Sequence, residues 1–240
     1  PKTDPPALTP QCDDNNPGDM LEVFDLTTNE VLIALGDPTL TFRYYYTQQD
    51  ALAAVNEILA PKAVLIGQNA WIRIENRNVD YQGNKCFVLV EQPLTVHPLP
   101  SIESPLPPYR ACDDDTDGIT TFDLSNPLLT KAILGPNQLP NDFTVTYYLT
   151  ALGANPKTNT GELPLPFTYQ NATPVTQDIY IRIVNNTTGC VNPFGVLTLV
   201  VEQAAFATGP QKFDDCDSYE GPGGTYFDGI NQVDLTQFSG

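Results

Sequence analysis

Basic residues, histidine and long apolar runs are scarce in this sequence of 240 residues. Only 11 lysines and arginines stand against 29 aspartates and glutamates, which gives a formal net charge of −18. Nucleic acids and anionic lipids bind proteins through many basic side chains, so we expect neither partner here. The single histidine, His97, argues against a histidine-rich zinc site and a serine–histidine–aspartate triad. No apolar run reaches 18 residues, so we expect no membrane contact by this fragment.

What the sequence does contain favours packed cores built from strands. Hydrophobic residues make up 41% of the chain and aromatic residues 10%, which separates it from disordered acidic proteins. Proline is frequent, with 23 residues, and charged residues are few for a soluble domain. This composition indicates an all-β, extracellular protein, although it names no reaction.

The chain contains an internal repeat with a period near 100 residues. Cys112 follows Cys12 by 100 residues, and each cysteine opens an acidic turn that ends in glycine. Later segments match in the same order, and a third copy opens at Cys216. A period of this length indicates whole domains in tandem rather than a solenoid. The expected divisions are a preceding linker 1–10, repeat 1 at 11–98, a proline-rich linker 99–110, repeat 2 at 111–203, and a linker with the start of a third repeat at 204–240.

The chain begins without methionine and ends inside this third copy. We therefore interpret the sequence as a piece of a longer protein, with any anchor or export signal outside it. The first junction, Pro98–Pro108, holds five prolines in eleven residues. Proline favours extended backbone, so the junction is expected to be semi-rigid and to hold the two repeats end to end as a rod.

The five cysteines occupy repeated positions. A disulfide framework in an oxidising compartment is predicted to join Cys12 to Cys86 and Cys112 to Cys190 within the repeats, and to leave Cys216 unpaired. The alternative is that all five are buried free thiols.

Short alternating segments predict several strands in each repeat, and therefore tandem immunoglobulin-like β-sandwiches with small helical insertions. The expected strands are 39–45, 70–75, 87–90, 144–149, 179–184 and 196–201. Asn126 before Pro127 predicts a helix start, and Gly135 its end, with 29–36 as the counterpart in repeat 1. A capping box, 47–50, predicts a further helix over 51–59. Repeat 2 has glycine and proline at that place, so the helix is expected to be absent there.

The acidic turn of repeat 2 carries the sharpest chemical signal. Asp113, Asp115 and Asp117 alternate before Gly118, a spacing that lets three carboxylates converge on a structural calcium ion. Asp123, Asp114 or the carbonyl of Ile119 could complete the ligand set. Repeat 1 offers the weaker pair Asp13 and Asn15. The alternative interpretation is a solvated acidic turn that caps a strand.

The remaining candidate sites are weak. Tyr44, Tyr45, Tyr46, Tyr147 and Tyr148 lie on predicted strands, where half of them should be core and the outward half could stack on sugars. A glycosidase would need two carboxylates facing each other in one cleft, but the acids cluster in turns. We expect no enzyme and no catalytic residue.

The repeated strings resemble a known family. Repeat 2 contains Cys-Asp-Asp-Asp-x-Asp-Gly before Phe-Asp-Leu, then Thr-Val-Thr-Tyr-Tyr, and then Ile-Tyr-Ile-Arg-Ile-x-Asn before Thr-Gly-Cys. These strings resemble the tandem repeats of large gliding-motility surface adhesins of the Bacteroidota. The resemblance spans roughly residues 10–240. It implies a cell-surface, outer-membrane-associated location, export by type IX secretion, and the gliding and secretion machinery as partners.

Two functions follow from these expectations. The first is a structural stalk whose repeats contact neighbouring repeats of the same chain and support adhesion and gliding. The second is a carbohydrate-binding module whose exposed aromatic side chains and calcium grip a surface polysaccharide. A contiguous patch of outward aromatic side chains would favour the second function.

Overall fold

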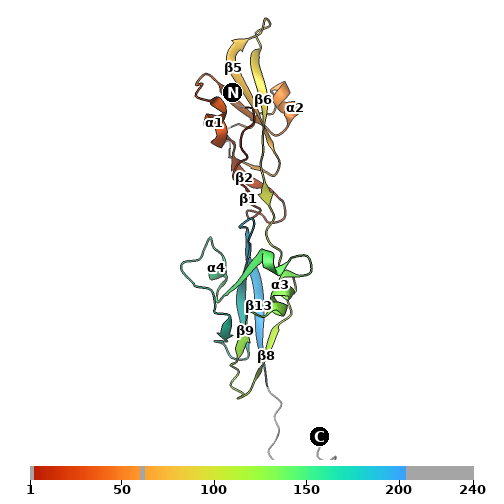
Figure 1. Cartoon of the computed structure of the whole chain (residues 1–240), viewed down its shortest axis with the longest axis vertical. Helices are drawn as coiled ribbons and strands as arrows, with labels where there is room; N and C mark the ends of the chain where they lie inside the picture. The colour runs from red at the N-terminus through yellow and green to blue at the C-terminus, as the bar shows by residue number, and fades with distance from the viewer. Residues whose placement is uncertain (1–2, 60–62, 204–240) are drawn as a thin grey trace, which may run out of the picture. The chain divides into compact units, whose positions relative to one another are not determined.

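The computed structural model describes residues 3–59 and 63–203, and each repeat within them is built mainly of β-strands (Figure 1). In that described part of the chain, no helix has the length and apolar character needed to cross a membrane. Cys216 and the start of the third copy lie outside the described residues.

Repeat 1 combines a three-stranded sheet with smaller two-stranded pairings. Strand β5 lies between β3 and β6 in antiparallel order, β2 pairs antiparallel with β4, and β1 pairs parallel with β7. Helices α1 and α2 flank the β5–β6 hairpin (Figure 1). The elements are β1 (Gln11–Cys12), β2 (Glu22–Asp25), a 3-10 turn (Leu26–Asn29), α1 (Glu30–Ala34), β3 (Thr41–Tyr45), α2 (Gln48–Ala53), β4 (Ala63–Ile66), β5 (Ala70–Val79), β6 (Lys85–Gln92) and β7 (Val96–His97).

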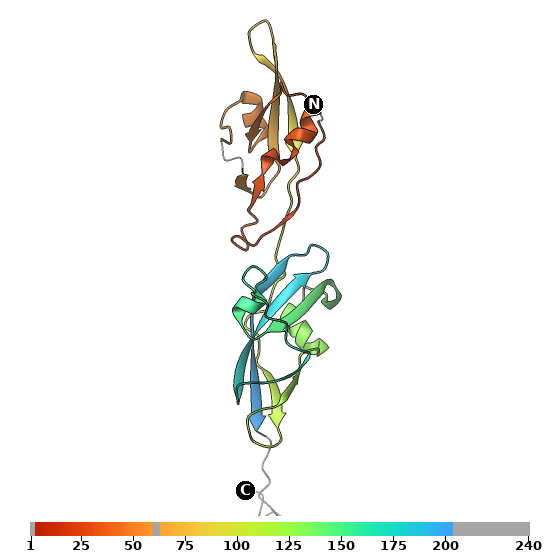
Figure 2. The same ribbon diagram turned by 90° about the vertical axis from the view of Figure 1, so that its left-hand side faces the viewer.

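Repeat 2 has the same plan with a larger sheet. The spatial order of its four-stranded sheet is β10-β12-β13-β8 (Figure 2). Strand β8, which comes first along the chain, lies parallel to β13, which comes last. Strands β9 and β11 form the second, antiparallel pair. The elements are β8 (Tyr109–Asp113), β9 (Thr121–Asp123), α3 (Pro127–Leu134), a 3-10 turn (Pro140–Asp142), β10 (Phe143–Tyr148), α4 (Ala151–Ala154), β11 (Thr168–Gln170), β12 (Thr176–Asn185) and β13 (Val191–Gln203).

Each repeat encloses its own apolar core between its sheets. In repeat 1, Phe24 of β2 and Ile72 of β5 are buried in one cluster. In repeat 2, Phe122 of β9 and Ile181 of β12 take the same roles in a second cluster. Alternate residues of the strands face these cores, as expected when two sheets pack face to face. The predicted fold class, all-β with tandem immunoglobulin-like β-sandwich repeats and small helical insertions, is confirmed.

The predicted strands are all present, some of them longer than the alternating pattern indicated. The helix start at Asn126 is confirmed, because its side chain accepts a hydrogen bond from the amide of Leu128 and α3 ends at Gly135. The counterpart α1 lies within the expected 29–36. Helix α2 begins at the predicted cap, Thr47, but ends at Ala53 rather than continuing to residue 59.

The predicted absence of a helix from the corresponding place in repeat 2 is wrong. Helix α4 forms there because Thr150 accepts a hydrogen bond from the amide of Gly153, as Thr47 does for Asp50. Glu162, from the following loop, accepts bonds from the amides of Leu149 and Thr150 at 2.8 and 3.1 Å. A Cβ at Gly153 would lie 2.3 Å from the Glu162 carboxylate, so a larger residue there would displace that side chain from its present position.

The segments expected to be linkers are packed against the repeats that follow them. Leu8, in the expected linker 1–10, is buried in the core of repeat 1. Ile102, in the middle of the proline-rich segment, packs against the core of repeat 2, and the amide of Glu103 donates to the carbonyl of Ile133 at 2.9 Å. Asn192 of β13 donates to the carbonyl of Pro100. The proline-rich segment is therefore fixed along most of its length by contacts with repeat 2.

Both repeats use one arginine to fix the end of a short helix. Arg73 of β5 donates to the carbonyls of Ala51 and Leu52 at 3.0 Å, and its guanidinium lies 3.4 Å from the ring centre of Phe87. Arg182 of β12 donates to the last carbonyls of α4 and stacks on Tyr148. These bonds satisfy carbonyls that a helix end leaves without partners.

We expect substitution Arg73→Ala to lower the free energy of unfolding of repeat 1 by about 3 kcal/mol. Arg73 also pairs at 2.8 Å with the buried carboxylate of Glu75, which the substitution would leave far less well compensated. Urea unfolding followed by the fluorescence of Trp71, the only tryptophan, measures this change. Arg77→Ala on the exposed end of β5 is the matched control, and an equal loss in both variants would contradict the role of Arg73.

Candidate functional site

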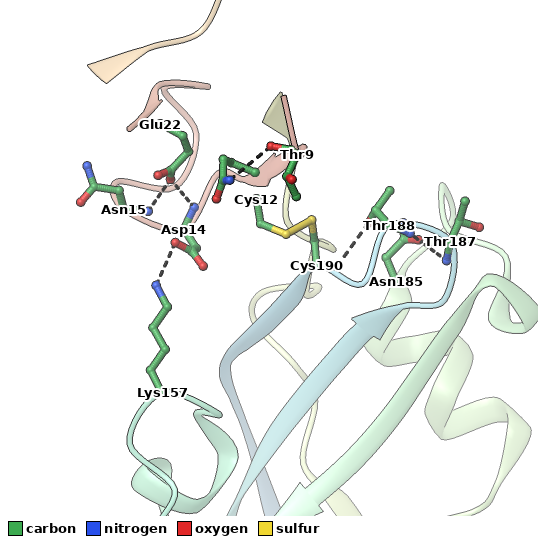
Figure 3. Close-up of a disulfide and its surroundings, with 11 residues drawn as sticks. Thr9, Cys12, Asp14, Asn15, Glu22, Lys157, Asn185, Thr187, Thr188 and Cys190 are labelled. Carbon is green, nitrogen blue, oxygen red and sulfur yellow. Dashed lines mark hydrogen bonds and ion pairs between the residues drawn. A yellow bond between two sulfur atoms is a disulfide. The ribbon is translucent and has the colours of Figure 1, made fainter. Parts of the chain in front are cut away.

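A disulfide joins the two repeats. Cys12, at the end of β1, bonds to Cys190, which directly precedes β13, and their Cα atoms lie 5.5 Å apart (Figure 3). The two cysteines are separated by 178 positions in the sequence. The bond therefore spans the proline-rich segment, so the two repeats are linked both by that segment and by a covalent bridge.

The predicted pairs Cys12–Cys86 and Cys112–Cys190 are wrong. The thiols of Cys86 and Cys112 are free and exposed. Cys112 lies opposite Glu202 in the parallel pairing of β8 with β13, whereas Cys190 lies at the other end of β13. Twelve residues of extended strand span about 40 Å, far beyond the roughly 7 Å that a disulfide tolerates between Cα atoms.

The same geometry separates the cysteines of repeat 1. Cys12 lies opposite His97 in the pairing of β1 with β7, and Cys86 is near the start of β6, eleven residues before His97. Each repeat thus carries its first cysteine at one end and its second at the other. A disulfide between these repeated positions can form only across a junction, from the first cysteine of one repeat to the second cysteine of the next.

An ion pair supports the disulfide at the junction. Lys157, in the loop after α4, places its Nζ 2.8 Å from the carboxylate of Asp14 in repeat 1 (Figure 3). The Glu22 carboxylate accepts bonds from the amides of Asp14 and Asn15 at 2.8 and 2.7 Å, which fixes the turn that carries the Asp14 side chain. Both charged groups are partly exposed, so the pair is worth at most about 1 kcal/mol and contributes mainly to orientation. Sequence reasoning identified neither Lys157 nor Glu22, because only the fold brings them to the cysteine.

The first aspartate after each leading cysteine anchors its turn. Asp13 is buried and accepts bonds from the amides of Gly18 and Met20 at 2.6 and 3.2 Å. Asp113 is equally buried and accepts a bond from the amide of Gly118 at 2.7 Å. Both glycines have positive φ, 105° and 80°, which ordinary residues rarely adopt. The shared bond from the carboxylate to the fifth following amide holds the backbone next to the cysteine.

Three of the predicted calcium ligands lie close together. Ligand oxygens of Asp113, Asp115 and Asp117 all lie within 4.8 Å of one another. Three backbone amides, that of Gly118 foremost, hold the pKa of Asp113 below its ordinary value. The backbone amide of Asp117 donates to Asp115 and favours its charged form. Three effects outweigh this amide and raise the pKa of Asp115: the hydrogen bond that it shares with Asp113, burial, and nearby negative charge. The turn therefore concentrates negative charge that a cation would relieve.

Two of the other predicted ligands, Asp123 and Asp13, are engaged elsewhere. Asp123 accepts bonds from the amide and hydroxyl of Ser125, just as Asp25 does from Thr27, so both begin a local turn. Asp13 serves its own turn, whereas only the backbone amide of Asn15 is engaged, by the carboxylate of Glu22. Among the residues that the structure describes, the only group of three or more acidic, cysteine or histidine ligands is the one at 113, 115 and 117.

Comparison with protein families finds a match that covers both repeats. The family model described as the Flavobacterium inter-domain disulphide bond domain matches residues 8–100 and, a second time, residues 108–205. No curated protein matches the sequence.

Several solved structures are similar at low sequence identity. Immunoglobulin domains 1–4 of Sidekick-1 match with 12% identity over 88% of this chain and 48% of that one, at a TM-score of 0.26. The cadherin-like domains 1–4 of zebrafish RET match with 13% identity over 68% and 38%, at 0.20. The protein SGBP-B of the Bacteroides ovatus mixed-linkage glucan utilization locus, in complex with a mixed-linkage heptasaccharide, matches with 11% identity over 81% and 43%, at 0.19. The chain spans less than half the length of each of these structures.

Peptide mapping of the oxidised chain without reductant is expected to recover Cys12 joined to Cys190. Substitution Cys190→Ser should remove that cross-linked peptide, whereas Cys86→Ser should leave it in place, because Cys86 lies at the opposite end of repeat 1. A cross-link between Cys12 and Cys86 in the unsubstituted chain would contradict the junction described here.

Calcium is expected to raise the melting temperature of repeat 2 by several degrees. At ~1 mM calcium and a dissociation constant of ~0.1 mM, mass action gives roughly 1.4 kcal/mol of stabilisation. Asp115→Ala should abolish most of the difference between calcium and chelator. Asp50→Ala, which removes an acidic side chain from the start of α2, should leave that difference unchanged. Identical melting curves in calcium and chelator would show that the acidic turn is only solvated.

Proposed function

Because this chain belongs to the Flavobacterium inter-domain disulphide bond domain family, we propose that its repeats are load-bearing stalk domains of a cell-surface adhesin. The observation that carries this proposal is the bond from Cys12 to Cys190. A bridge between successive domains suits a chain that is pulled from its ends. The role is structural rather than enzymatic, and disulfides of this kind belong to an oxidising, extracellular setting.

The disulfide gives tension a path around the folded domains. Force applied at the N-terminal side reaches Cys12 and crosses directly to Cys190, so the residues between them carry little load. That interval includes nearly all of repeat 1, the proline-rich segment and most of repeat 2. Most of the core of repeat 1 is thereby bypassed, whereas in repeat 2 the load runs along β13, whose pairing with β12 and β8 must resist the pull.

Cys86 and Cys112 extend this arrangement in both directions. Cys86 is the counterpart of Cys190, and Cys112 is the counterpart of Cys12, yet both thiols are free and exposed. In a longer array, Cys112 would bond to the second cysteine of the following repeat and Cys86 to the first cysteine of the preceding one. Every linker of the array would then be spanned by a covalent bridge.

The resemblance to gliding adhesins gives this stalk a cellular setting. We infer that the protein lies outside the cell in association with the outer membrane, that type IX secretion exports it, and that it supports surface adhesion and gliding. A filament moved along a surface under load needs domains that neither unfold nor swing freely at their junctions. Two features restrict swinging at the junction between the repeats: the ion pair between Asp14 and Lys157, and the packed proline-rich segment.

Single-molecule pulling on the full chain, held at its two ends, tests the load-bearing role. In the oxidised chain, the segment between Cys12 and Cys190 should contribute no extension even after its cores unfold. In reductant, the same segment of 178 residues should add roughly 600 Å. Cys190→Ser should release this length without reductant, whereas Cys86→Ser should behave like the unsubstituted chain. Full extension of the oxidised chain would refute a load-bearing disulfide.

A further inference from the structure

We propose that repeat 1 carries a binding site for a neutral oligosaccharide, centred on Tyr46 and Trp71. This inference goes beyond the stalk role and rests on different residues. A shallow concave surface lies at the edge of the sheet where β3 and β6 end and β5 begins. The residues that line it include Tyr46, Gln48, Gln68, Asn69, Trp71 and Glu91.

The sheet register places the aromatic and acidic groups beside each other. Trp71 of β5 lies opposite Tyr45 of β3 on one side and opposite Glu91 of β6 on the other. Residues directly opposite in an antiparallel sheet face the same way, so Trp71 and Glu91 share the outer face. Tyr46 follows at the end of β3 and is 43% exposed, so part of this residue is open to solvent.

The chemistry of the lining fits a sugar. A pyranose ring presents an apolar face of C–H groups that packs against the electron-rich face of Tyr or Trp. Its hydroxyl groups both donate and accept hydrogen bonds, as the side-chain amides of Gln48 and Gln68 do. In the described part of the chain, neither of these amides nor the Tyr46 hydroxyl has an internal hydrogen-bond partner. The Asn69 side chain is held in place, since it donates to Glu91 at 2.8 Å and accepts from the amide of Leu94 at 3.0 Å.

A second hollow continues from the first, which suits a chain of sugars rather than a single one. Tyr46 and Gln68 line both hollows, and Leu21 and Leu65 line the second. Neither hollow is lined by a lysine, arginine or histidine. The carboxylate of Glu91 and the net charge of −18 would repel an acidic polysaccharide, so the expected ligand is neutral.

Repeat 2 shows that the fold does not require this surface. Thr150 caps α4 as Thr47 caps α2, so Leu149 and Ala151 stand where repeat 1 has Tyr46 and Gln48. The pairing of Tyr148 with Tyr180, and of Tyr180 with Val196, places these residues at the positions of Tyr45, Trp71 and Glu91. The counterparts of Gln68 and Asn69 both make hydrogen bonds within repeat 2. Gln177 donates to the hydroxyl of Tyr169, and Asp178 accepts from the hydroxyl of Thr198. The exposed tyrosine and the free amides are thus features of repeat 1 alone.

Tryptophan fluorescence tests the proposal directly, because Trp71 is the only tryptophan in the chain. The full chain is titrated with cellohexaose, xylohexaose and mannohexaose, and with hexagalacturonate as the acidic comparison. We expect at least one neutral hexasaccharide to change the emission saturably, with half-saturation below about 10 mM, and hexagalacturonate to have no effect.

Variants separate a specific site from a general response. Tyr46→Ala should weaken binding by about tenfold or more, and Gln68→Ala should weaken it by a smaller factor. Tyr81→Ala, at a fully exposed tyrosine of the β5–β6 turn, is the matched control and should bind unchanged. The proposal is overturned if no neutral hexasaccharide shifts the emission, if the acidic one binds best, or if Tyr46→Ala binds as well as the unsubstituted chain. None of these results bears on the pulling experiment, so the two proposals fail separately.

Discussion

The length of an extended strand is the constraint on which the rest of this molecule depends. In repeat 2 the 13 residues of β13 separate the two cysteine positions, and in repeat 1 strand β6 and the segment that leads to β7 do the same. Neither repeat can close its own disulfide, so a bond is possible only where the end of one repeat meets the start of the next. The disulfide between the repeats therefore follows from the length of the strands. The ion pair of Asp14 and the turn held by Asp13 support the same junction.

Much of the fold was predictable because its signals are local. Alternating apolar and polar residues indicated the strands. Asn126 and Pro127 indicated the start of helix α3, and Gly135 indicated its end. Helix α4 escaped prediction because glycine and proline at this place outweighed its local cap, Thr150, and because Glu162, which accepts a bond from the Thr150 amide, lies twelve residues further along. The cysteine pairing escaped for a related reason. Cysteines at matching positions in two repeats are equally compatible with disulfides within repeats and with disulfides between repeats. Only the distance between Cα atoms along β13 excludes the bond within a repeat.

The acidic turn shows how one sequence motif can serve two purposes. Asp13 and Asp113 both fix a backbone turn beside a cysteine, which explains the first aspartate in each copy without any ion. Asp115 and Asp117 accept further bonds from the amides of Asp117 and Ile119 and add charge to the turn. The hydrogen bond that Asp115 shares with Asp113, together with burial and nearby negative charge, raises the pKa of Asp115. The spacing that indicated calcium therefore identified a structural element in both repeats and a cation candidate in one.

The two repeats keep the same internal devices and differ on their surfaces. The arginine at the helix end, the threonine cap and the aspartate-anchored turn occur in both, because each satisfies backbone groups that the sandwich leaves open. Surface positions such as Tyr46 and Leu149 face no such demand, since they contribute little to either core. A domain held in place through its ends by covalent bridges is free to vary along its sides. A stalk of the proposed kind could therefore carry binding surfaces on chosen repeats without weakening the path along which force is transmitted.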